Sequence, residues 1–308
     1  MHPLLKKALV ATVLTATRAA DHQENSEGVI FVADYDGAKG ARLRGMKELG
    51  ASVFRLKELH PTLNITLYCD ETTRELLQST RVGNLASLAS TDLSRTGGQT
   101  GAKQKATALL NSPYDKTIFF DSDYFVLSGS FLGSMFELLN RFDLVQPMAW
   151  ARHTVGPHRG FPNLCTCMIA LRRNNVTSYL MQGWENLIKD GWRGRDQEAL
   201  FELTDRRWRQ YPDLRIWSLP EEYQCALEKS ATGQPYLLST VGRLKEGLTA
   251  RDFQKGGARL ASEGIVQDAL LGTHECQVVH THGITYPPSA ARFVAQLERD
   301  LSLINPRN

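Results

Sequence analysis

The stretch "KTIFFDSDYFVL", residues 116–127, places two carboxylates, Asp121 and Asp123, within a run of Ile, Phe, Tyr, Val and Leu. Burying an ionised carboxylate is costly unless the group is paired, hydrogen-bonded or bound to a metal. No Lys or Arg occurs between Lys116 and Arg141, so the segment cannot neutralise its own acids. Their counter-charge must come from another part of the chain or from a ligand.

The segments around this stretch alternate between strand and helix patterns. β-branched and aromatic runs predict strands at 28–36, 64–71 and 116–121, and helical patterns separate them at 38–60, 72–80 and 102–112. This alternation predicts βαβ units and a parallel sheet in an α/β protein. Ligands bind at the carboxyl ends of the strands in such sheets, and Asp121 and Asp123 follow a central strand.

Further elements continue the pattern toward the C-terminus. We expect strands at 143–150 and 164–173, and helices at 130–142, 174–190, 197–203 and 289–304. The Gly-, Ser- and Thr-rich residues 90–101 predict a mobile loop. The pattern weakens between 226 and 275, where glycines are frequent, and this indicates an insertion or lid. We therefore predict one domain over 28–308.

The composition is that of an ordinary soluble globular protein, with 42% hydrophobic and 22% charged residues in 308. A net charge of +3 gives no support for a nucleic-acid partner. Lys6 and Lys7 precede a nine-residue apolar run, 8–16, so the extension 1–27 has the outline of a signal or targeting segment. The run is too short for a membrane span. A secreted or Golgi protein is expected if 1–27 is a signal segment, and a cytoplasmic protein otherwise.

The five cysteines are odd in number and irregularly spaced, which argues against a disulfide framework and against a zinc site. The cysteines do not indicate whether the protein works in an oxidising or a reducing compartment. They are Cys69, Cys165, Cys167, Cys225 and Cys276.

Four interpretations of the acidic pair remain after the segments are placed. The plainest is a strand that ends in a turn, with Asp121 capping and Asp123 exposed. A phosphatase of the haloacid-dehalogenase kind fits poorly, because Tyr124 and Phe125 follow the motif. A third interpretation is a divalent metal held by both carboxylates and bridging to a diphosphate. The fourth is a relative that keeps the fold of such an enzyme but only binds its ligand.

An ordered set of motifs resembles glycosyltransferase family 8, which includes glycogenin and bacterial lipopolysaccharide galactosyltransferases. The set is Lys105, "YDKTIFFDSD" at 114–123, "RDQEAL" at 195–200, "LPEEYQC" at 219–225 and "VVHTHG" at 278–283. The resemblance implies the GT-A fold, a Rossmann-like, mostly parallel sheet flanked by helices. It implies a metal-dependent transferase of the hexosyltransferase type. The donor would be a nucleotide-diphosphate sugar, linked to UDP, whose anomeric configuration is retained on transfer. The acceptor would be a carbohydrate or a glycoconjugate.

The resemblance also implies roles for individual residues. Mn²⁺ or Mg²⁺ would be held by Asp121 and Asp123 of the D-x-D motif together with His280, for which the alternative is a core histidine. Asp196 would bind the donor's hydroxyls, and Gln197 would stabilise an oxocarbenium-like state; the alternative for Asp196 is a helix N-cap. The remaining donor- and nucleotide-binding positions are Ala33, Asp34, Tyr35, Lys105, Asp121, Ser122, Cys165 and Gly283.

Three departures from the family's pattern bear on the donor site. Cys165 and Cys167 stand where relatives carry Asn and Gly, and a thiol cannot replace the hydrogen bonds of an amide. Tyr286 stands where a diphosphate-binding Lys is common, and Gln224 where Asn is usual. The alternative is therefore a degenerate nucleotide-sugar or glycan-binding relative. A sugar nucleotidyltransferase is disfavoured, because no Gly-rich phosphate loop follows the first strand.

Overall fold

The structure is a computed structural model. It describes residues 26–33, 39–90, 100–147, 164–190, 192, 196–206, 208–219, 224–229, 235–238, 278–280 and 288–304. Residues 1–25, residues 91–99 of the predicted loop and most of the predicted insertion at 226–275 lie outside these ranges. Among the helices of the described residues, none combines the length and the apolar character that a bilayer span requires.

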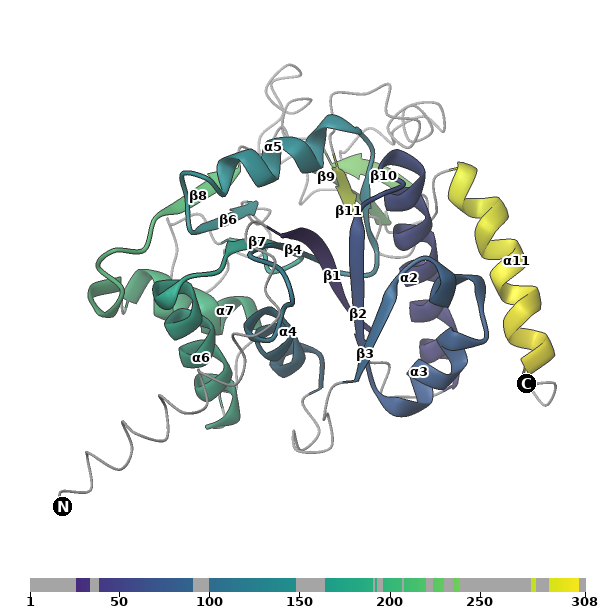
Figure 1. The fold of residues 1–308 in the computed structure, drawn as a ribbon, viewed down its shortest axis with the longest axis horizontal. Coiled ribbons are helices and arrows are strands. Elements are labelled where there is room, and N and C mark those ends of the chain that lie inside the picture. The colour runs from purple at the N-terminus through teal and green to yellow at the C-terminus, as the bar shows by residue number, and fades with distance from the viewer. Residues whose placement is uncertain are drawn as a thin grey trace.

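A seven-stranded sheet forms the centre of the molecule, in the order β3-β2-β1-β4-β7-β6-β8 (Figure 1). Its strands are β1 (Glu27–Ala33), β2 (Asn64–Cys69), β3 (Ser87–Ser90), β4 (Lys116–Phe120), β6 (Leu144–Pro147), β7 (Met168–Arg172) and β8 (Ile216–Leu219). The described pairings are parallel except for those that β7 makes with β4 and β6. The α/β class and the mostly parallel sheet are confirmed.

The position and direction of β7 differ from the parallel sheet that the sequence predicts. This strand inserts between β4 and β6 and runs antiparallel to both. Its sequence could not reveal this, because a short hydrophobic strand buried on both faces has the same pattern in either direction. The insertion has a consequence for the site, since the residues that precede β7 come to lie beside the residues that follow β4.

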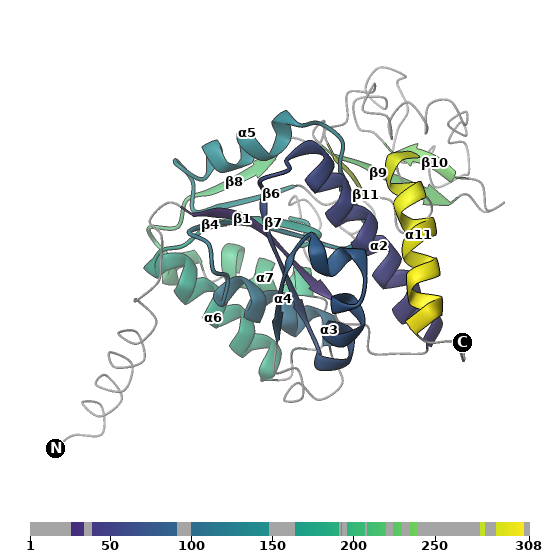
Figure 2. The same cartoon turned by 45° about the vertical axis from the view of Figure 1, so that its right-hand side comes forward.

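The α-helices are close to the predicted positions, whereas the short helical turns η1 and η5 were not predicted. They are α2 (Lys39–Leu59), α3 (Glu71–Gln78), η1 (Arg81–Asn84), α4 (Thr100–Leu110), α5 (Ser130–Leu138), α6 (Asn175–Lys189), α7 (Asp196–Phe201), η4 (Glu202–Arg206), η5 (Trp208–Gln210) and α11 (Pro288–Ile304). Figures 1 and 2 show α4, α6 and α7 on one side of the sheet and α2 and α11 on the other.

The alternation of side chains along the strands explains these two layers. Phe31, Ile118 and Phe120 belong to the core cluster that includes residues of α2, α5 and α11. Ile30 and Phe119 belong to the cluster with residues of α4, α6 and α7. Each of these five side chains is at most 1% exposed, and full burial of such a group contributes about 2 kcal/mol. Continuing the alternation past the end of β4 directs residue 121 toward the side of α4.

The C-terminal helix α11 packs along α2, and both figures show the two helices side by side. The close approach depends on Gly50, because a Cβ there would lie 2.5 Å from Cδ2 of Leu297. The rings of Phe54 and Phe293 stack with their centroids 4.7 Å apart. The last predicted helix is therefore part of the layer that supports α2.

A second, smaller sheet has the order β10-β9-β11-β5. Its strands are β5 (Tyr124–Val126), β9 (Gln224–Lys229), β10 (Pro235–Leu238) and β11 (Val278–His280). β11 pairs antiparallel with β5 and parallel with β9. The first part of the segment predicted as an insertion, about 226–275, thus contributes β9 and β10 to this sheet.

Candidate active site

The acidic turn at 121–123 joins the two sheets, because β4 ends at Phe120 and β5 begins at Tyr124. The backbone N–H of Tyr124 donates to the carbonyl of Asp121 at 3.1 Å, which closes a tight turn. From α2, the buried hydroxyl of Ser52 donates to the carbonyl of Ser122 at 2.6 Å. The turn that the plainest interpretation predicted is therefore present, and its backbone is fixed from the side of α2.

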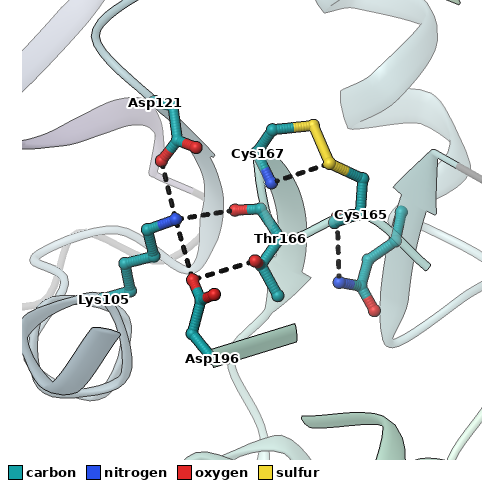
Figure 3. The surroundings of a disulfide bond; sticks show 7 residues. Lys105, Asp121, Cys165, Thr166, Cys167 and Asp196 are labelled. Carbon is teal, nitrogen blue, oxygen red and sulfur yellow. Dashed lines mark hydrogen bonds and ion pairs between the residues drawn. A yellow bond between two sulfur atoms is a disulfide. The ribbon is translucent and has the colours of Figure 1, made fainter. Parts of the chain in front are cut away.

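Lys105 supplies a cation to the acidic turn, which has no Lys or Arg between Lys116 and Arg141. Its Nζ lies 2.8 Å from Oδ1 of Asp121 and 2.9 Å from Oδ2 of Asp196 (Figure 3). Lys105 comes from α4, which covers the side of the sheet toward which residue 121 is directed, and its Nζ is 5.5 Å from the ring centre of Phe119. The ammonium thus joins α4, the end of β4 and the start of α7.

These contacts fix the protonation of the cluster. Burial lowers the pKa of Lys105, but the charges of Asp121 and Asp196 and its hydrogen bonds to both outweigh burial and raise this pKa. Burial raises the pKa of Asp196, and the charge and hydrogen bond of Lys105 outweigh it and lower this pKa. Lys105 is therefore protonated and Asp196 ionised at neutral pH.

Thr166 is part of the cluster although the sequence analysis did not identify it. Its Oγ1 donates to Oδ2 of Asp196 at 2.9 Å, and its carbonyl accepts from Nζ of Lys105 at 3.5 Å (Figure 3). The segment is placed by β7, since the N–H of Asp121 donates to the carbonyl of Cys167 at 2.8 Å. The signal that could have found Thr166 is its position between the two cysteines that replace Asn and Gly.

A disulfide bond joins Cys165 and Cys167, with Cα atoms 5.3 Å apart. The spacing of the cysteines argued against a disulfide framework, and it did not reveal this bond. The bond closes a ring over only three residues, so it does not cross-link distant elements. It surrounds Thr166 and therefore lies next to the Lys105 cluster (Figure 3).

Gln197 follows Asp196 in α7, and its Nε2 is buried with no hydrogen-bond partner within the described part of the chain. Leaving a buried amide donor unsatisfied costs about 1–3 kcal/mol. An acceptor from a bound molecule would remove this cost. Gln197 is one residue from Asp196, whose carboxylate pairs with Lys105.

The predicted third metal ligand, His280, is brought to the acidic turn by the pairing of β11 with β5. His280 is the register partner of Tyr124, which follows Asp123 directly. Residues more than 150 positions apart thus meet at the backbone level. Among the side chains that the structure describes, which do not include that of His280, no group of three or more His, Cys, Asp or Glu is gathered around one point.

The other predicted positions are only partly described. Ala33 ends β1 and is buried in the core, and Ser122 is half-buried in the turn. Asp34, Tyr35, Gly283 and Tyr286 lie outside the described residues. The structure therefore brings together Lys105, Asp121, Asp196 and Cys165, with Ser122, Asp123 and Gln197 adjacent in sequence.

No protein-family model matches the chain, and no curated protein matches it either. Solved structures with a similar arrangement include the galactosyltransferase LgtC, crystallised with donor and acceptor sugar analogues. LgtC is 12% identical over 89% of this chain and 95% of its own, with a TM-score of 0.47.

Two others are mouse xyloside xylosyltransferase 1 and the glycosyltransferase GlyE of Streptococcus pneumoniae. The first is 14% identical over 82% of this chain and 97% of its own, with a TM-score of 0.47. The second is 16% identical over 84% and 54%, with a TM-score of 0.45. Likeness at this level does not identify a substrate or a reaction.

Proposed function

We propose that this chain is a metal-dependent glycosyltransferase with the GT-A fold, which transfers a sugar from a UDP-linked donor to a carbohydrate or glycoconjugate acceptor with retention at the anomeric carbon. The choice of family 8, of UDP and of retention follows the resemblance of the sequence motifs. The observation that carries the proposal is the cluster of Lys105, Asp121 and Asp196 at the carboxyl end of β4.

The groups of this cluster suit a ligand that brings positive charge or hydrogen-bond donors. The ammonium of Lys105 lies 2.8 Å from a carboxylate oxygen of Asp121 and 2.9 Å from one of Asp196, and Asp123 follows in the same turn. Sugar hydroxyls can donate to carboxylates, and a divalent cation can lie between them. Sugar hydroxyls and a divalent cation are both present in a nucleotide sugar bound with its metal.

The donor atoms of the turn suit a hard divalent cation. Asp121 and Asp123 supply carboxylate oxygens, the ligand type that Mn²⁺ and Mg²⁺ prefer. His280, next to the turn by register, would complete the set. When bound, the ion would supply Lewis-acid screening of the diphosphate.

The chain's own residues would orient the sugar and stabilise positive charge on it. Asp196, fixed by Lys105 and Thr166, would accept hydrogen bonds from the sugar's hydroxyls. The side chain of Gln197 would approach the reacting face, where its amide oxygen stabilises an oxocarbenium-like state. Pre-oriented polar groups of this kind act without reorganising during the reaction.

A non-catalytic binder is the second candidate, and the Cys165–Cys167 bond favours it. The bond occupies the two positions at which family 8 sequences carry Asn and Gly, and it removes an amide from the donor side. The acidic cluster is needed for both candidates, so binding alone does not separate them.

Nucleotide release separates the two. The purified chain is incubated with a panel of UDP-, GDP- and CDP-sugars, with Mn²⁺, with Mg²⁺ and with chelator. We expect release of UDP from one UDP-sugar, dependent on the metal. Thermal stabilisation by UDP with Mn²⁺, without release from any sugar, would favour the binder. Neither stabilisation nor release from any nucleotide would overturn the proposed function.

A further inference from the structure

We propose that Cys165 and Cys167 form a reversible thiol–disulfide site, opened by a dithiol reductant, whose state determines how firmly Thr166 holds Asp196 and Lys105. The reactivity of the bond does not depend on the proposed function, whereas its effect on a donor nucleotide rests on that function.

The ring is anchored on both sides by the backbone of neighbouring strands. The N–H of Cys165 donates to the carbonyl of Pro147, at the end of β6, at 2.8 Å. On the other side, the carbonyl of Cys167 accepts from the N–H of Asp121 at 2.8 Å. The bond therefore spans the gap between the end of β6 and the acidic turn that follows β4.

Thr166 is the part of the ring that meets the site. Its side chain and its carbonyl contact Asp196 and Lys105, respectively, and Figure 3 shows both groups directed away from the sulfurs. A closed ring of three residues restricts the backbone dihedral angles of its central residue. Opening the ring gives Thr166 more conformations, so its two contacts become weaker on average.

The two cysteine residues differ in exposure, which sets the order of the exchange. Cys167 is 3% exposed, whereas Cys165 is half-buried. A reductant thiolate therefore attacks Sγ of Cys165 and forms a mixed disulfide, and Cys167 leaves as a thiolate. The second thiol of the reductant then attacks the reductant sulfur that is bonded to Sγ of Cys165. This closes the reductant's own disulfide and releases Cys165 as a thiol. The chain gains two electrons and two protons, and the dithiol becomes a disulfide.

Cys69 provides an internal control. This residue is a free thiol in β2 and is fully buried, and burial raises its pKa to about 12. It stays a protonated, inaccessible thiol under the conditions in which exposed thiols exchange. A redox response that survives Cys69→Ala therefore does not come from this position.

The first measurement locates the bond and tests its reversibility. Folded protein is equilibrated with reduced and oxidised dithiothreitol in graded ratios, quenched with acid, alkylated and mapped by peptide mass. We expect the peptide with Cys165 and Cys167 to gain two labels in one transition and to lose them on reoxidation. Peptide mapping separates this pair from Cys225 and Cys276. Alkylation of both cysteines without reductant would show that the disulfide is absent, and alkylation of neither in excess reductant would show that it does not open. Either result would overturn the proposal.

The second measurement tests the coupling to the site without using any ligand. Amide hydrogen exchange of α7, residues 196–201, is compared between the oxidised and reduced protein. We expect exchange in α7 to be several-fold faster in the reduced form, and Cys165→Ser/Cys167→Ser to show no redox difference. Equal exchange in both forms of the wild-type protein would contradict the coupling.

The third measurement connects the bond to the donor. We expect the Kd of UDP in the presence of Mn²⁺ to be about tenfold higher for the reduced protein, as for loss of one hydrogen bond to a charged group. Equal Kd values in the two redox forms would overturn this part. If neither form binds UDP, the proposed function fails, while the labelling and exchange results still decide the redox site.

Discussion

Two ion clusters lie at opposite ends of β4 and β7, and they differ in the exposure of their carboxylates. Arg172 is the register partner of Lys116 at one end, and Met168 is the partner of Phe120 at the other. The first end carries the buried Asp143, and the second carries the cluster around Lys105. The Asp143 cluster was not anticipated from the sequence.

Asp143 is surrounded by donors. Its carboxylate accepts from the backbone N–H of Arg215 at 2.9 Å, from Nε of Arg215 at 3.1 Å and from Nδ2 of Asn174 at 2.7 Å, and it pairs with Arg172. Its side chain is 3% exposed. One carboxylate thus meets two guanidinium groups and an amide, and this cluster holds β6, β7 and the segment before β8 together.

The Lys105 cluster is more exposed. Its ammonium pairs with Asp121 and Asp196, whose side chains are 27% and 20% exposed, and Nε2 of Gln197 has no hydrogen-bond partner in the described part of the chain. A cluster that stabilises the fold satisfies its own groups, whereas a binding site keeps capacity for its ligand. The predictions below test this distinction.

The largest effect is expected at the acidic turn. Asp123→Asn should abolish metal-dependent binding of UDP, because a neutral amide is a poor ligand for a hard cation. Calorimetric titration with UDP and Mn²⁺ measures the affinity, and urea unfolding without metal checks that the variant is folded. Asp213→Asn, at an exposed position near β8, is the control. Full metal-dependent affinity in the variant would remove Asp123 from the proposed ligands.

Asp143→Ala should lower the stability of the fold and leave the binding of UDP unchanged, the reverse of Asp123→Asn. It removes several hydrogen bonds to charged groups, so the free energy of unfolding should fall by roughly 3 kcal/mol. The folded fraction should bind UDP with unchanged affinity. Urea unfolding checks the stability, with Asp213→Ala as the matched exposed aspartate. A loss below about 0.5 kcal/mol would mean that the cluster does not stabilise the fold.

Gln197→Ala should spare binding and lower turnover. The amide is expected to act on the reacting sugar, and the loss of such an electrostatic contact costs about 10- to 100-fold in kcat. Initial rates of UDP release give kcat and KM separately. Gln182→Ala, at an exposed position of α6, is the control. An unchanged kcat with a raised KM would assign Gln197 to ground-state binding instead.

The stability of the protein should fall in acid, with Asp143 as a main contributor. Burial raises the pKa of Asp143, but hydrogen bonds from Arg215, Arg172 and Asn174 outweigh it and lower the pKa from 3.8 to about 2. The unfolded state therefore binds more protons in this range, and about 2 kcal/mol is lost as the pH falls through it. Urea midpoints at pH 5, 4 and 3 measure the slope. The slope should flatten in Asp143→Asn, and an equal slope would contradict the assignment.

The smallest effect is expected for Thr166→Val, which removes the hydroxyl that holds Asp196. We expect a loss of about 1 kcal/mol in transition-state stabilisation, seen as a several-fold lower kcat/KM for UDP release. Thr107→Val is a matched control, because Thr107 donates to Glu185 at 2.6 Å between α4 and α6. That variant should lose stability without a change in kcat/KM. Equal kinetic effects of the two variants would mean that the loss is not specific to Asp196.

Much of the fold follows from local sequence patterns. β4, the acidic turn after it and the helices on both sides are predicted by apolar spacing, because period 2 and period 3.6 are local properties of the chain. The antiparallel direction of β7 was missed, since a short buried strand carries no sign of direction. The sequence also required a counter-charge for Asp121 from another segment, and the structure identifies Lys105 as its source.

The contacts that complete the site depend on distances between elements. Lys105 and Asp196 were proposed only from the family resemblance, and nothing local joins α4 to α7. Thr166 and the disulfide were missed because β7 must insert beside β4 before residues 165–167 can reach Asp121. The Asp143 cluster was missed for the same reason, as its partners lie 29 to 72 residues away.

The acidic turn has a mechanical consequence, because it is also the connection between the two sheets. Three residues, 121–123, span about 10 Å at full extension, so the sheets cannot separate far without straightening the turn. The hydroxyl of Ser52 holds that turn on α2, and α2 is braced in turn by the C-terminal helix. Shortening the chain at its far end would therefore loosen the point at which Asp121 and Asp123 are held.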